Sequence, residues 1–358
     1  MTDYERICDF QNLYHAHMTL RLGKRNKTEV IRYELELARN LIELSEHLKN
    51  RTYKMQGYYH FQVHEPKTRD VFAAYYPDRV LLKCICDQVV TPVLQNRVIY
   101  DNAACQKGKG THFALKRVTK FLAEHYKKHG AQGYALKCDI TKYFASIDHA
   151  TLKSKLDKVI LDPEIRAILF DFIDNHHTEG RPGVGLPLGN HSSQWFAIYY
   201  LDRADRFIKE ELRVKHYIRY MDDILLIHPS KEFLNNALRQ MIEVIEGELK
   251  LTLNDKTRIF PIRDGVEFLG WRFYITETGK IVRKVKAQTR LRFRRRVKKL
   301  QNDYNAGLIE LEDVRNSLAS YKGHFKHGHA YKFNNRVFKD FVLKRDEKPN
   351  DIYLDEIT

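Results

Sequence analysis

The sequence has few cysteines, and no pattern among them indicates a pairing. The five cysteines are an odd number, and no two of them form a Cys-x-x-Cys pair. This argues against a disulfide framework or a cysteine zinc site and favours reduced thiols in a cytosol. No stretch approaches the roughly 18 apolar residues that a membrane-spanning helix needs. The N-terminus also lacks the apolar core of a signal peptide, so we expect a cytoplasmic protein with no membrane partner.

Acidic residues are in deficit. The 358 residues include 62 Lys and Arg against 46 Asp and Glu, which gives a net charge of +16. Such a balance indicates a polyanionic partner, with nucleic acid first and an anionic membrane second. Because no segment is suited to a membrane, nucleic acid is favoured. The length suffices for two or three subdomains that share a substantial core.

Residues 214–228 place a pair of acids between two β-prone runs. An alternating run leads into Tyr220-Met221-Asp222-Asp223, and an apolar run leads away. This pattern predicts a hairpin whose turn presents carboxylates. Since the flanks are apolar, the acids lie where a buried sheet ends and need a compensating charge, for which bound metal is favoured. An ordinary polar turn is the alternative, unless a third carboxylate is present.

Asp139 is the candidate for the third carboxylate. It stands at the end of a predicted strand over 134–140, before a turn into a helix that begins near Asp148. Three acids arranged in this way predict a site for two Mg²⁺ ions, about 3.5–4 Å apart, that clamp the oxygens of an in-line phosphoryl displacement. The absence of a His or Cys ligand set fits Mg²⁺ better than Zn²⁺.

The two acidic stretches together resemble the palm motifs of reverse transcriptases. The second matches the Tyr-x-Asp-Asp box, and Asp139 to Phe144 matches the Asp-x₄-Phe/Tyr box. The resemblance covers roughly residues 50–340 and implies an α/β (α+β) right-hand polymerase with fingers, an antiparallel palm sheet and a helical thumb. The implied divisions are an N-terminal helical extension at 1–50, fingers and palm at 51–275, and a basic helical thumb and C-terminal tail at 276–358.

The resemblance also implies an activity and its partners. The activity is RNA-directed DNA synthesis, with template RNA, an RNA or DNA primer, dNTPs and two Mg²⁺ ions, for which Mn²⁺ could substitute. The implied catalytic residues are Asp139, Asp222, Asp223 and Lys256. The implied metal ligands are Asp139, Ile140, Asp222 and Asp223. The implied nucleotide-binding residues are Lys67, Arg69, Arg79, Phe144, Leu188, Gly189 and Gln194. The implied primer- or template-binding residues are Lys107, Lys109, Phe268, Leu269, Gly270, Trp271, Arg294, Arg295 and Arg296.

Several of these assignments compete with an ordinary interpretation. Lys67 and Arg69, at the tip of a predicted hairpin over 53–74, could be solvated surface. The glycine- and lysine-rich loop around Lys107 and Lys109 precedes a helix predicted at 112–128. A loop at a helix N-terminus suits phosphate, although it is not a Walker loop and a plain loop is the alternative.

Phe144 and Lys256 leave similar choices open. Phe144 has the spacing of the family's aromatic residue that blocks a 2′-hydroxyl, or it is an ordinary core residue. Lys256 lies in a segment, residues 251–260, that looks like the fourth palm motif. It is the candidate to protonate or neutralise the departing pyrophosphate, and a lone exposed lysine is the alternative.

Helical periodicity is visible in several segments. Apolar residues recur at helical spacing over 30–48 and 233–249, and residues 80–98 have the pattern of a buried helix. The 233–249 helix is expected to back the palm sheet. A further helix is expected near 192–200, with Ser192 or Ser193 near its cap.

The C-terminal part is strongly basic. From Lys280 to Lys299 there are eleven Lys and Arg residues and no acid. A helix with an apolar seam and a basic remainder fits a thumb that lies along a nucleic-acid backbone, and a solvated face is the alternative. The apolar residues of the seam are Val282, Val285, Leu291, Phe293 and Val297. Just before this run, residues 266–273 resemble the primer-grip hairpin.

Two positions separate this chain from most reverse transcriptases. Leu188 stands where Gln is usual, and Gln194 stands where Pro is usual. The resulting Leu-Gly-x₃-Ser-Gln pattern is similar to that of diversity-generating retroelements. This implies error-prone copying at template adenines, cDNA that replaces a variable gene segment, and a small basic oligomeric accessory protein. Loss of a positioning amide makes looser discrimination physically reasonable.

Two alternatives to this subtype remain. Another bacterial reverse transcriptase, from a retron or an antiphage system, would usually keep Gln at the Leu188 position. A catalytically dead nucleic-acid-binding scaffold is the alternative from another class, and the intact acid set argues against it.

Overall fold

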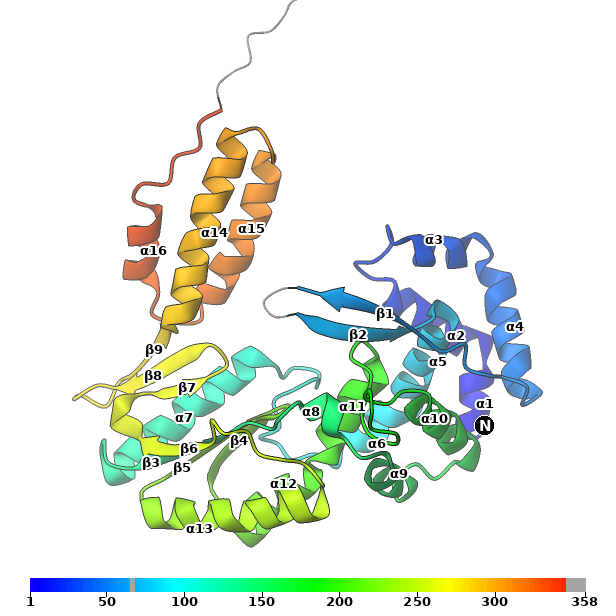
Figure 1. The fold of residues 1–358 in the computed structure, drawn as a ribbon, viewed down its shortest axis with the longest axis horizontal. Coiled ribbons are helices and arrows are strands. Elements are labelled where there is room, and N and C mark those ends of the chain that lie inside the picture. Colours follow the sequence, from blue (N-terminus) through cyan, green and yellow to red (C-terminus); the bar gives the residue numbers. More distant parts are fainter. Residues whose placement is uncertain (65–67, 346–358) are drawn as a thin grey trace, which may run out of the picture. The chain divides into compact units, whose positions relative to one another are not determined.

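A computed structural model describes residues 1–64 and 68–345 (Figure 1), so the predicted nucleotide-binding Lys67 lies outside the described residues. The chain forms two compact units. Unit 1 comprises residues 1–117 and 134–259, and unit 2 comprises residues 118–133 and 260–358. The predicted divisions after residues 50 and 275 stay predictions. Within the described residues, no helix combines the length and apolar character that crossing a bilayer requires.

Unit 1 begins with four helices. They are α1 (Asp3–Cys8), α2 (Phe10–Leu20), α3 (Thr28–Leu35) and α4 (Leu37–Lys49). The single helix predicted over 30–48 is wrong, because the backbone breaks at Glu36, whose φ of −125° and ψ of 37° are not helical. The break changes which residues face the core: Leu41 and Leu48 are buried as expected, whereas Leu35 is 78% exposed.

The next elements carry one predicted nucleotide-binding hairpin. Strands β1 (Tyr58–Val63) and β2 (Arg69–Ala74) pair antiparallel, with Val63 opposite Arg69, which confirms the predicted hairpin. The helix predicted over 80–98 begins earlier and ends earlier. It consists of α5 (Tyr76–Ile85), a π-helical turn (Cys86–Val90) and α6 (Thr91–Gln95).

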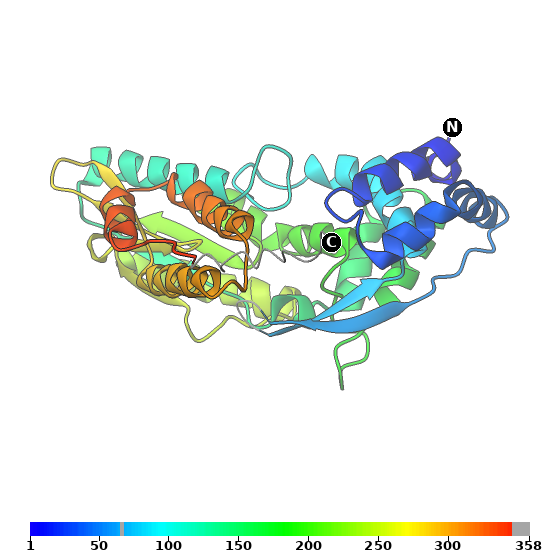
Figure 2. The same ribbon diagram turned by 90° about the horizontal axis from the view of Figure 1, so that it is seen from above.

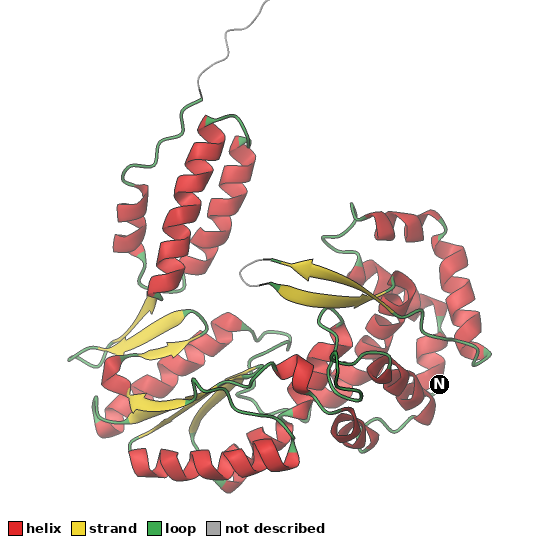
Figure 3. Cartoon of the chain, viewed as in Figure 1, coloured by secondary structure: helices red, strands yellow, loops and turns green. Residues whose placement is uncertain are grey.

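A four-stranded antiparallel sheet lies in the region of the predicted palm. Its strands are β3 (Tyr134–Cys138), β4 (His216–Tyr220), β5 (Asp223–His228) and β6 (Arg258–Pro261), in the order β4-β5-β3-β6. Figure 3 draws the strands of the protein in yellow. Helix α13 (Lys231–Ile242) contacts β3 and β5 and covers one face, as predicted (Figure 1). This mixed α/β architecture with an antiparallel sheet confirms the predicted fold class.

The remaining helices of the first 260 residues connect these elements. They are α7 (Thr111–His129), α8 (Tyr143–Ser146), α9 (His149–Asp157), α10 (Pro163–Asp174), α11 (His191–Tyr200) and α12 (Asp202–Arg206). The N-cap of α11 is Asn190, so Ser192 and Ser193 lie two and three residues after the cap, near it as predicted. Both serines are buried in the first turn, where α11 enters the core.

Unit 2 has its own sheet and helices. Strands β7 (Val266–Phe268), β8 (Trp271–Ile275) and β9 (Ile281–Val285) form an antiparallel sheet, followed by α14 (Ala287–Asn305), α15 (Leu311–Phe325) and α16 (Tyr331–Phe338). Helices α14 and α15 pack side by side (Figures 1 and 2). The basic run therefore comprises strand β9 and the first two thirds of α14. Within α14, Phe293 and Val297 form the expected buried seam, whereas Leu291 is exposed.

Replacing Gly328 by Ala is expected to destabilise unit 2 by about 1–3 kcal/mol. A Cβ at this position would overlap the ring of Trp271, which is completely buried. Gly323→Ala is the matched control, because a Cβ there meets no atom within 4 Å and Ala favours the helix by up to about 1 kcal/mol. Denaturant unfolding of the two variants measures the difference, and equal stabilities would show that Gly328 does not limit the packing of Trp271.

Candidate active site

The predicted acidic hairpin is formed by β4 and β5. Tyr220 pairs with Asp223, so Met221 and Asp222 form a two-residue turn. Met221 has a φ of +55°, which a first turn residue between tightly paired strands requires. Behind the turn, β5 continues as four buried residues, 224–227. Asp222 thus projects from the end of a rigid, buried hairpin.

Asp139 is brought to the same end of the sheet. Strand β3 pairs with β5 so that Cys138 lies opposite Ile224, and each strand then continues to an aspartate, Asp139 or Asp223. On the other side, the Asn254 amide donates to the Asp139 carbonyl at 2.7 Å. The structure therefore brings the predicted acids, which come from two separate chain segments, to the same end of the sheet.

The carboxylates perturb one another. Burial raises the pKa of Asp223 to about 6; the ammonium of Lys137, 3.2 Å from Oδ1, opposes this, and the charges of Asp139 and Asp222 add to it. Burial also raises the pKa of Asp222; a backbone hydrogen bond opposes this, the charge of Asp139 adds to it, and the charges of Arg219 and Arg69 oppose it. The site therefore concentrates negative charge that nearby cations only partly compensate.

These features fit a divalent cation. Within residues 1–64 and 68–345, no three acidic, His or Cys side chains converge into a ready-made metal cage. Mg²⁺ is usually held by one or two carboxylates together with waters and substrate phosphates, so a crowded carboxylate pair is sufficient. The side chain of Ile140 is buried, and only its carbonyl could serve as the predicted ligand.

Without divalent metal, this crowding predicts a pH dependence of stability. Since the folded-state pKa of Asp223 lies above the ordinary value, its contribution is fully present below the unfolded pKa of 3.8 and is lost as pH rises through about 6. In EDTA, the unfolding free energy of Asp223→Asn minus that of the wild type should therefore increase between pH 4 and pH 7. Denaturant titrations across this range give the difference. Parallel curves for the two proteins would contradict the raised pKa.

Several predicted nucleotide-binding residues lie along β2. The Phe72 amide donates to the Leu188 carbonyl at 3.1 Å, and a Cβ on Gly189 would lie 3.1 Å from Val71 Cγ1. Gly189 also has a φ of +124°, so glycine suits both the backbone and the close approach. The half-buried Phe144 is connected to the same segment, because its carbonyl accepts from the Leu186 amide at 2.8 Å.

Two other residues predicted to bind nucleotide or template already have partners within the protein. Arg79 forms an ion pair with Glu29 of α3 and is only 11% exposed, so it does not present its guanidinium to a triphosphate in this structure. Lys109 donates to the carbonyls of Tyr100 and Asn102 and thereby fastens its own loop. The proposed contacts of Arg79 and Lys109 with nucleotide and template therefore stay predictions, and each would require the present partner to be exchanged. The neighbouring Lys107 is exposed, as template contact requires.

Two further residues of the predicted site, Gln194 and Lys256, are exposed. Gln194 is exposed at the start of α11 and accepts a hydrogen bond from the Cys105 thiol at 3.3 Å, so it faces the 103–111 loop. Lys256 is exposed in the turn that follows Asn254, whose amide binds the Asp139 carbonyl. The hydrogen bond between Asn254 and Asp139 thus brings the main chain that carries Lys256 close to Asp139.

The predicted primer grip needs correction. Phe268 and Trp271 pair across the β7–β8 hairpin and are both 0% exposed, because they fill the core of unit 2. Their side chains therefore cannot contact a primer. Leu269 and Gly270, with φ of +46° and +82°, form the turn and are partly exposed. For Leu269 and Gly270 in this turn, contact with a primer stays a prediction.

The three arginines of α14 are exposed but differ in their surroundings. Arg294 lies over the Phe333 ring at 5.6 Å, and Arg296 Nε donates to Ser317 Oγ at 3.4 Å. Arg295 follows Phe293 by two residues, so on a helix it points away from the buried seam. It is therefore the arginine of this group best placed to contact a phosphate.

Two charged residues near the acids escaped the sequence reasoning. Lys137 lies on β3 and faces Asp223, and Arg219 lies on β4 with its side chain completely buried. The sequence feature that could have identified each of them is a basic residue in a largely apolar predicted strand, two or three residues before a proposed catalytic aspartate. Such a residue needs a partner on the buried side.

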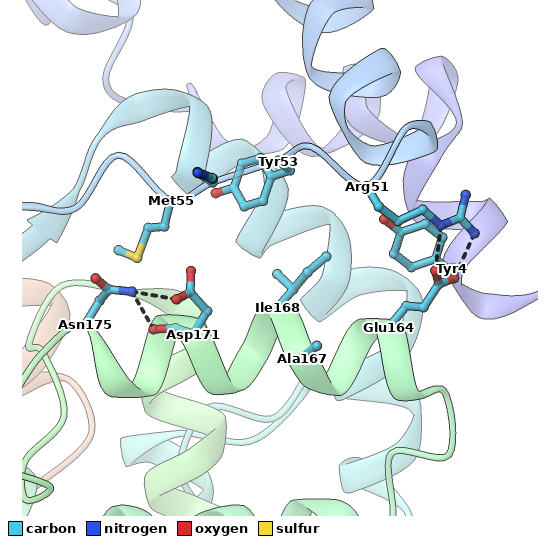
Figure 4. A pocket seen from close by; sticks show the side chains of 10 residues that line it. Tyr4, Arg51, Tyr53, Met55, Glu164, Ala167, Ile168, Asp171 and Asn175 are labelled. Atoms are coloured by element: carbon cyan, nitrogen blue, oxygen red, sulfur yellow. Dashed lines mark hydrogen bonds and ion pairs between the residues drawn. The ribbon is translucent and has the colours of Figure 1, made fainter.

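A cavity of about 580 Å³ opens elsewhere in unit 1 (Figure 4). It lies between the 51–55 segment, α1 and α10. Arg51 crosses its rim, stacks 5.0 Å from the Tyr4 ring and binds Glu164. No predicted site residue lines it, so we do not assign the substrate to this cavity.

Comparison with known proteins gives a consistent result. Residues 77–273, more than half of the chain, match the family described as "Reverse transcriptase (RNA-dependent DNA polymerase)". A segment of 85 residues is 27% identical to the Gag-Pro-Pol polyprotein of mouse mammary tumor virus (strain BR6) and spans 5% of that protein.

Solved telomerase structures are also similar. Telomerase from Candida albicans, in complex with a TWJ fragment of telomeric RNA, aligns with a TM-score of 0.48 and 14% identity, over 82% of this chain and 60% of the other. Apo telomerase from Candida tropicalis aligns with a TM-score of 0.48 and 12% identity, over 65% and 49%. The chain thus spans less than two thirds of the relatives it matches.

Proposed function

This chain belongs to the reverse transcriptase (RNA-dependent DNA polymerase) family, and we propose that it extends a primer with dNTPs along an RNA template. The observation that carries the proposal is the meeting of Asp139 and Asp222 at one end of the antiparallel sheet, where Asp139 raises the pKa of Asp222. A binding scaffold would gain nothing from crowding carboxylates where phosphates must lie. A nucleotidyl-transfer site requires them.

The residues then take distinct roles. Asp139 and Asp222, with Asp223 and the Ile140 carbonyl in support, would hold two Mg²⁺ ions. When bound, the ions supply the charge that lowers the pKa of the primer 3′-hydroxyl and neutralises the departing pyrophosphate. Lys137, which is 3.2 Å from Asp223, limits the repulsion among the three acids.

The incoming nucleotide would lie along β2. Arg69 is the cation at the start of this strand whose charge opposes the raised pKa of Asp222, which supports a position near the triphosphate. Phe144 would pack under the sugar and exclude a 2′-hydroxyl. Leu188 and Gly189 would line the nascent pair, and Lys256 would serve the departing pyrophosphate.

We further propose that the enzyme copies its RNA with frequent errors at adenines and serves targeted gene diversification. Leu188 supports this, because an aliphatic side chain next to the pair cannot demand a hydrogen bond from it. The exposed Gln194, in the position of the usual proline, is the second difference. The same proposal includes a small basic oligomeric accessory protein that holds the structured template.

Leu188→Gln is expected to lower misincorporation opposite template adenine by about two- to tenfold, the value of one neutral hydrogen bond. Errors opposite the other three bases should change less. The experiment copies one heteropolymeric RNA from a DNA primer with wild type and variant and sequences the cDNA. Full-length cDNA from the wild type supports the polymerase, and equal adenine error rates in the two proteins would remove Leu188 as the cause of infidelity.

The accessory protein has a separate test. Purification from the native operon is expected to recover the enzyme with a small basic protein, and template-specific synthesis should depend on adding that protein back. Full template-specific synthesis by the enzyme alone would contradict this part of the proposal and leave the polymerase assignment intact.

A further inference from the structure

Behind the turn that carries Asp222 lies an ion pair that solvent does not reach. The side chains of Arg219 on β4 and Asp205 on α12 are both 0% exposed. Arg219 Nε donates to Asp205 Oδ1 at 2.7 Å, and Nη2 donates to Oδ2 of the same carboxylate. The hydroxyl of Tyr217 donates a third hydrogen bond to Asp205. The pair is therefore complete without any contact to substrate.

The rest of the guanidinium reaches the main chain of two other elements. Nη2 donates to the Ile198 carbonyl on α11 at 2.9 Å, and Nη1 donates to the Met221 carbonyl at 2.9 Å. The Met221 carbonyl belongs to the peptide bond that leads into Asp222. Because a guanidinium is a planar fork, these bonds fix the turn relative to α11 and α12.

The turn is a place where such a constraint is needed. Met221 has a φ of +55°, a conformation that glycine adopts readily and other residues adopt at a cost. A side-chain-bearing residue remains there only when its surroundings impose the conformation. The Arg219 bond to the Met221 carbonyl acts directly on this peptide.

Stability alone does not account for the pair. Replacing a buried ion pair by apolar residues of similar volume is often neutral or stabilising, so its presence indicates another use. The main chain of Arg219 is also held from the opposite side, since its amide donates to the Asp101 carbonyl and its carbonyl accepts from the Ala103 amide. Both the main chain and the side chain of Arg219 are therefore held by neighbouring elements, and from this fixed position the guanidinium binds the turn.

We propose that Arg219 is a positioning residue that sets the direction of the Asp222 carboxylate by holding the Met221 peptide, with Asp205 as its anchor. This inference rests on the proposed polymerase function of the site. Arg219 does not touch substrate, so its loss should affect the use of metal and the rate of incorporation more than the binding of primer and template.

The deciding variant removes the whole buried polar group: Arg219→Met, Asp205→Leu and Tyr217→Phe. No unpaired charge or hydroxyl then remains in the core. We expect a melting temperature close to that of the wild type, with single-turnover incorporation of one dNTP lowered about 10- to 100-fold, as is typical when the residue behind a metal ligand is lost. The Mg²⁺ concentration for half-maximal rate should rise, and the Kd for primer–template should stay unchanged.

A readout without metal or substrate separates positioning from activity. In EDTA, amide hydrogen exchange in peptides that cover 220–223 should be about two- to tenfold faster in the variant, the loss of one hydrogen bond. The exchange rates of amides in α13, which packs on β3 and β5, should not change. Unchanged exchange at the turn in a folded variant would overturn the proposal.

The control is Arg203→Met with Glu248→Leu. Arg203 also lies on α12 and forms a bidentate pair with Glu248, at 2.8 and 3.0 Å, but it does not contact the turn. This variant should keep the wild-type rate and Mg²⁺ dependence.

If the triple variant does not fold, Arg219→Lys decides. Lysine keeps the charge opposite Asp205 but cannot span both that carboxylate and the Met221 carbonyl, so the same losses are expected. A wild-type rate and Mg²⁺ dependence in a folded variant would overturn the positioning role. An inactive wild-type enzyme would instead contradict the proposed function, so the two failures are distinguishable.

Discussion

Reversing the charges of Arg294, Arg295 and Arg296 to Glu is expected to weaken binding of a primer–template duplex by roughly a hundredfold at physiological salt. The expectation follows from their exposure on α14 and from the release of counterions, in which each phosphate contact contributes about 0.7–0.9 to the slope of log affinity against log salt. If all three arginines touch phosphates, the slope should fall by about 2.

Single variants refine this expectation. Arg295 points away from the buried seam, whereas Arg294 and Arg296 are partly engaged with Phe333 and Ser317. Among the three single variants, Arg295→Glu should therefore cause the largest loss of primer–template affinity. The control reverses three exposed cations of the α2–α3 connection (Lys24, Arg25 and Lys27), which changes the net charge equally. Equal salt slopes in the α14 variant and the wild type would mean that this face is only solvated.

Asp222→Asn is expected to lower primer extension by about a thousandfold or more. The carboxylate is proposed to help hold the ions that stabilise the charge of the transferring phosphoryl group, an effect of several kcal/mol, and each 1.36 kcal/mol is tenfold in rate. Asp139→Asn should have a comparable effect. Since the change removes charge from the metal site and not from the basic surfaces, the Kd for primer–template should change little.

The control for this prediction is Asp255→Asn. Asp255 is exposed in the turn beside Lys256. Its replacement by Asn is the same chemical change, made at an aspartate that is not one of the three proposed metal-binding acids. Extension kinetics and duplex binding should be measured for all three variants. Near-normal extension by either Asp222→Asn or Asp139→Asn would remove the two-metal assignment.

The palm was accessible from the sequence because its signals are local. The alternation before Tyr220 and the apolar run after Asp223 specify two strands, and a turn of two residues then fixes the register. The position of Asp139 followed from a strand that ends in an acid. These patterns depend on neighbours in the chain, so no knowledge of distant contacts was needed.

The sequence did not reveal contacts between residues that are distant in the chain. Arg79 was assigned to a triphosphate, but Glu29 on α3 pairs with it, and nothing near Arg79 in the sequence announces that contact. Phe268 and Trp271 were assigned to the primer, but a two-residue turn places them opposite each other on the same face, which is buried by α15 and the segment at Gly328. In that case the hairpin pattern itself contained the information.

The buried pair behind the catalytic turn shows the same limit. Arg219 was not identified from the sequence: its partner Asp205 lies on a short helix 14 residues earlier, and its contact with the Met221 carbonyl depends on the folded turn. A basic residue in a buried strand indicates that a partner exists. Its identity depends on tertiary packing.

The measurement that tests the account most directly is incorporation of dTTP on poly(rA)/oligo(dT) by the purified wild-type chain, with Mg²⁺ and with EDTA. The account predicts a ladder of extended primers that requires Mg²⁺ and is absent for Asp139→Asn at equal protein concentration. An unextended primer in the presence of Mg²⁺, under conditions where the protein is folded and binds the duplex, would contradict it.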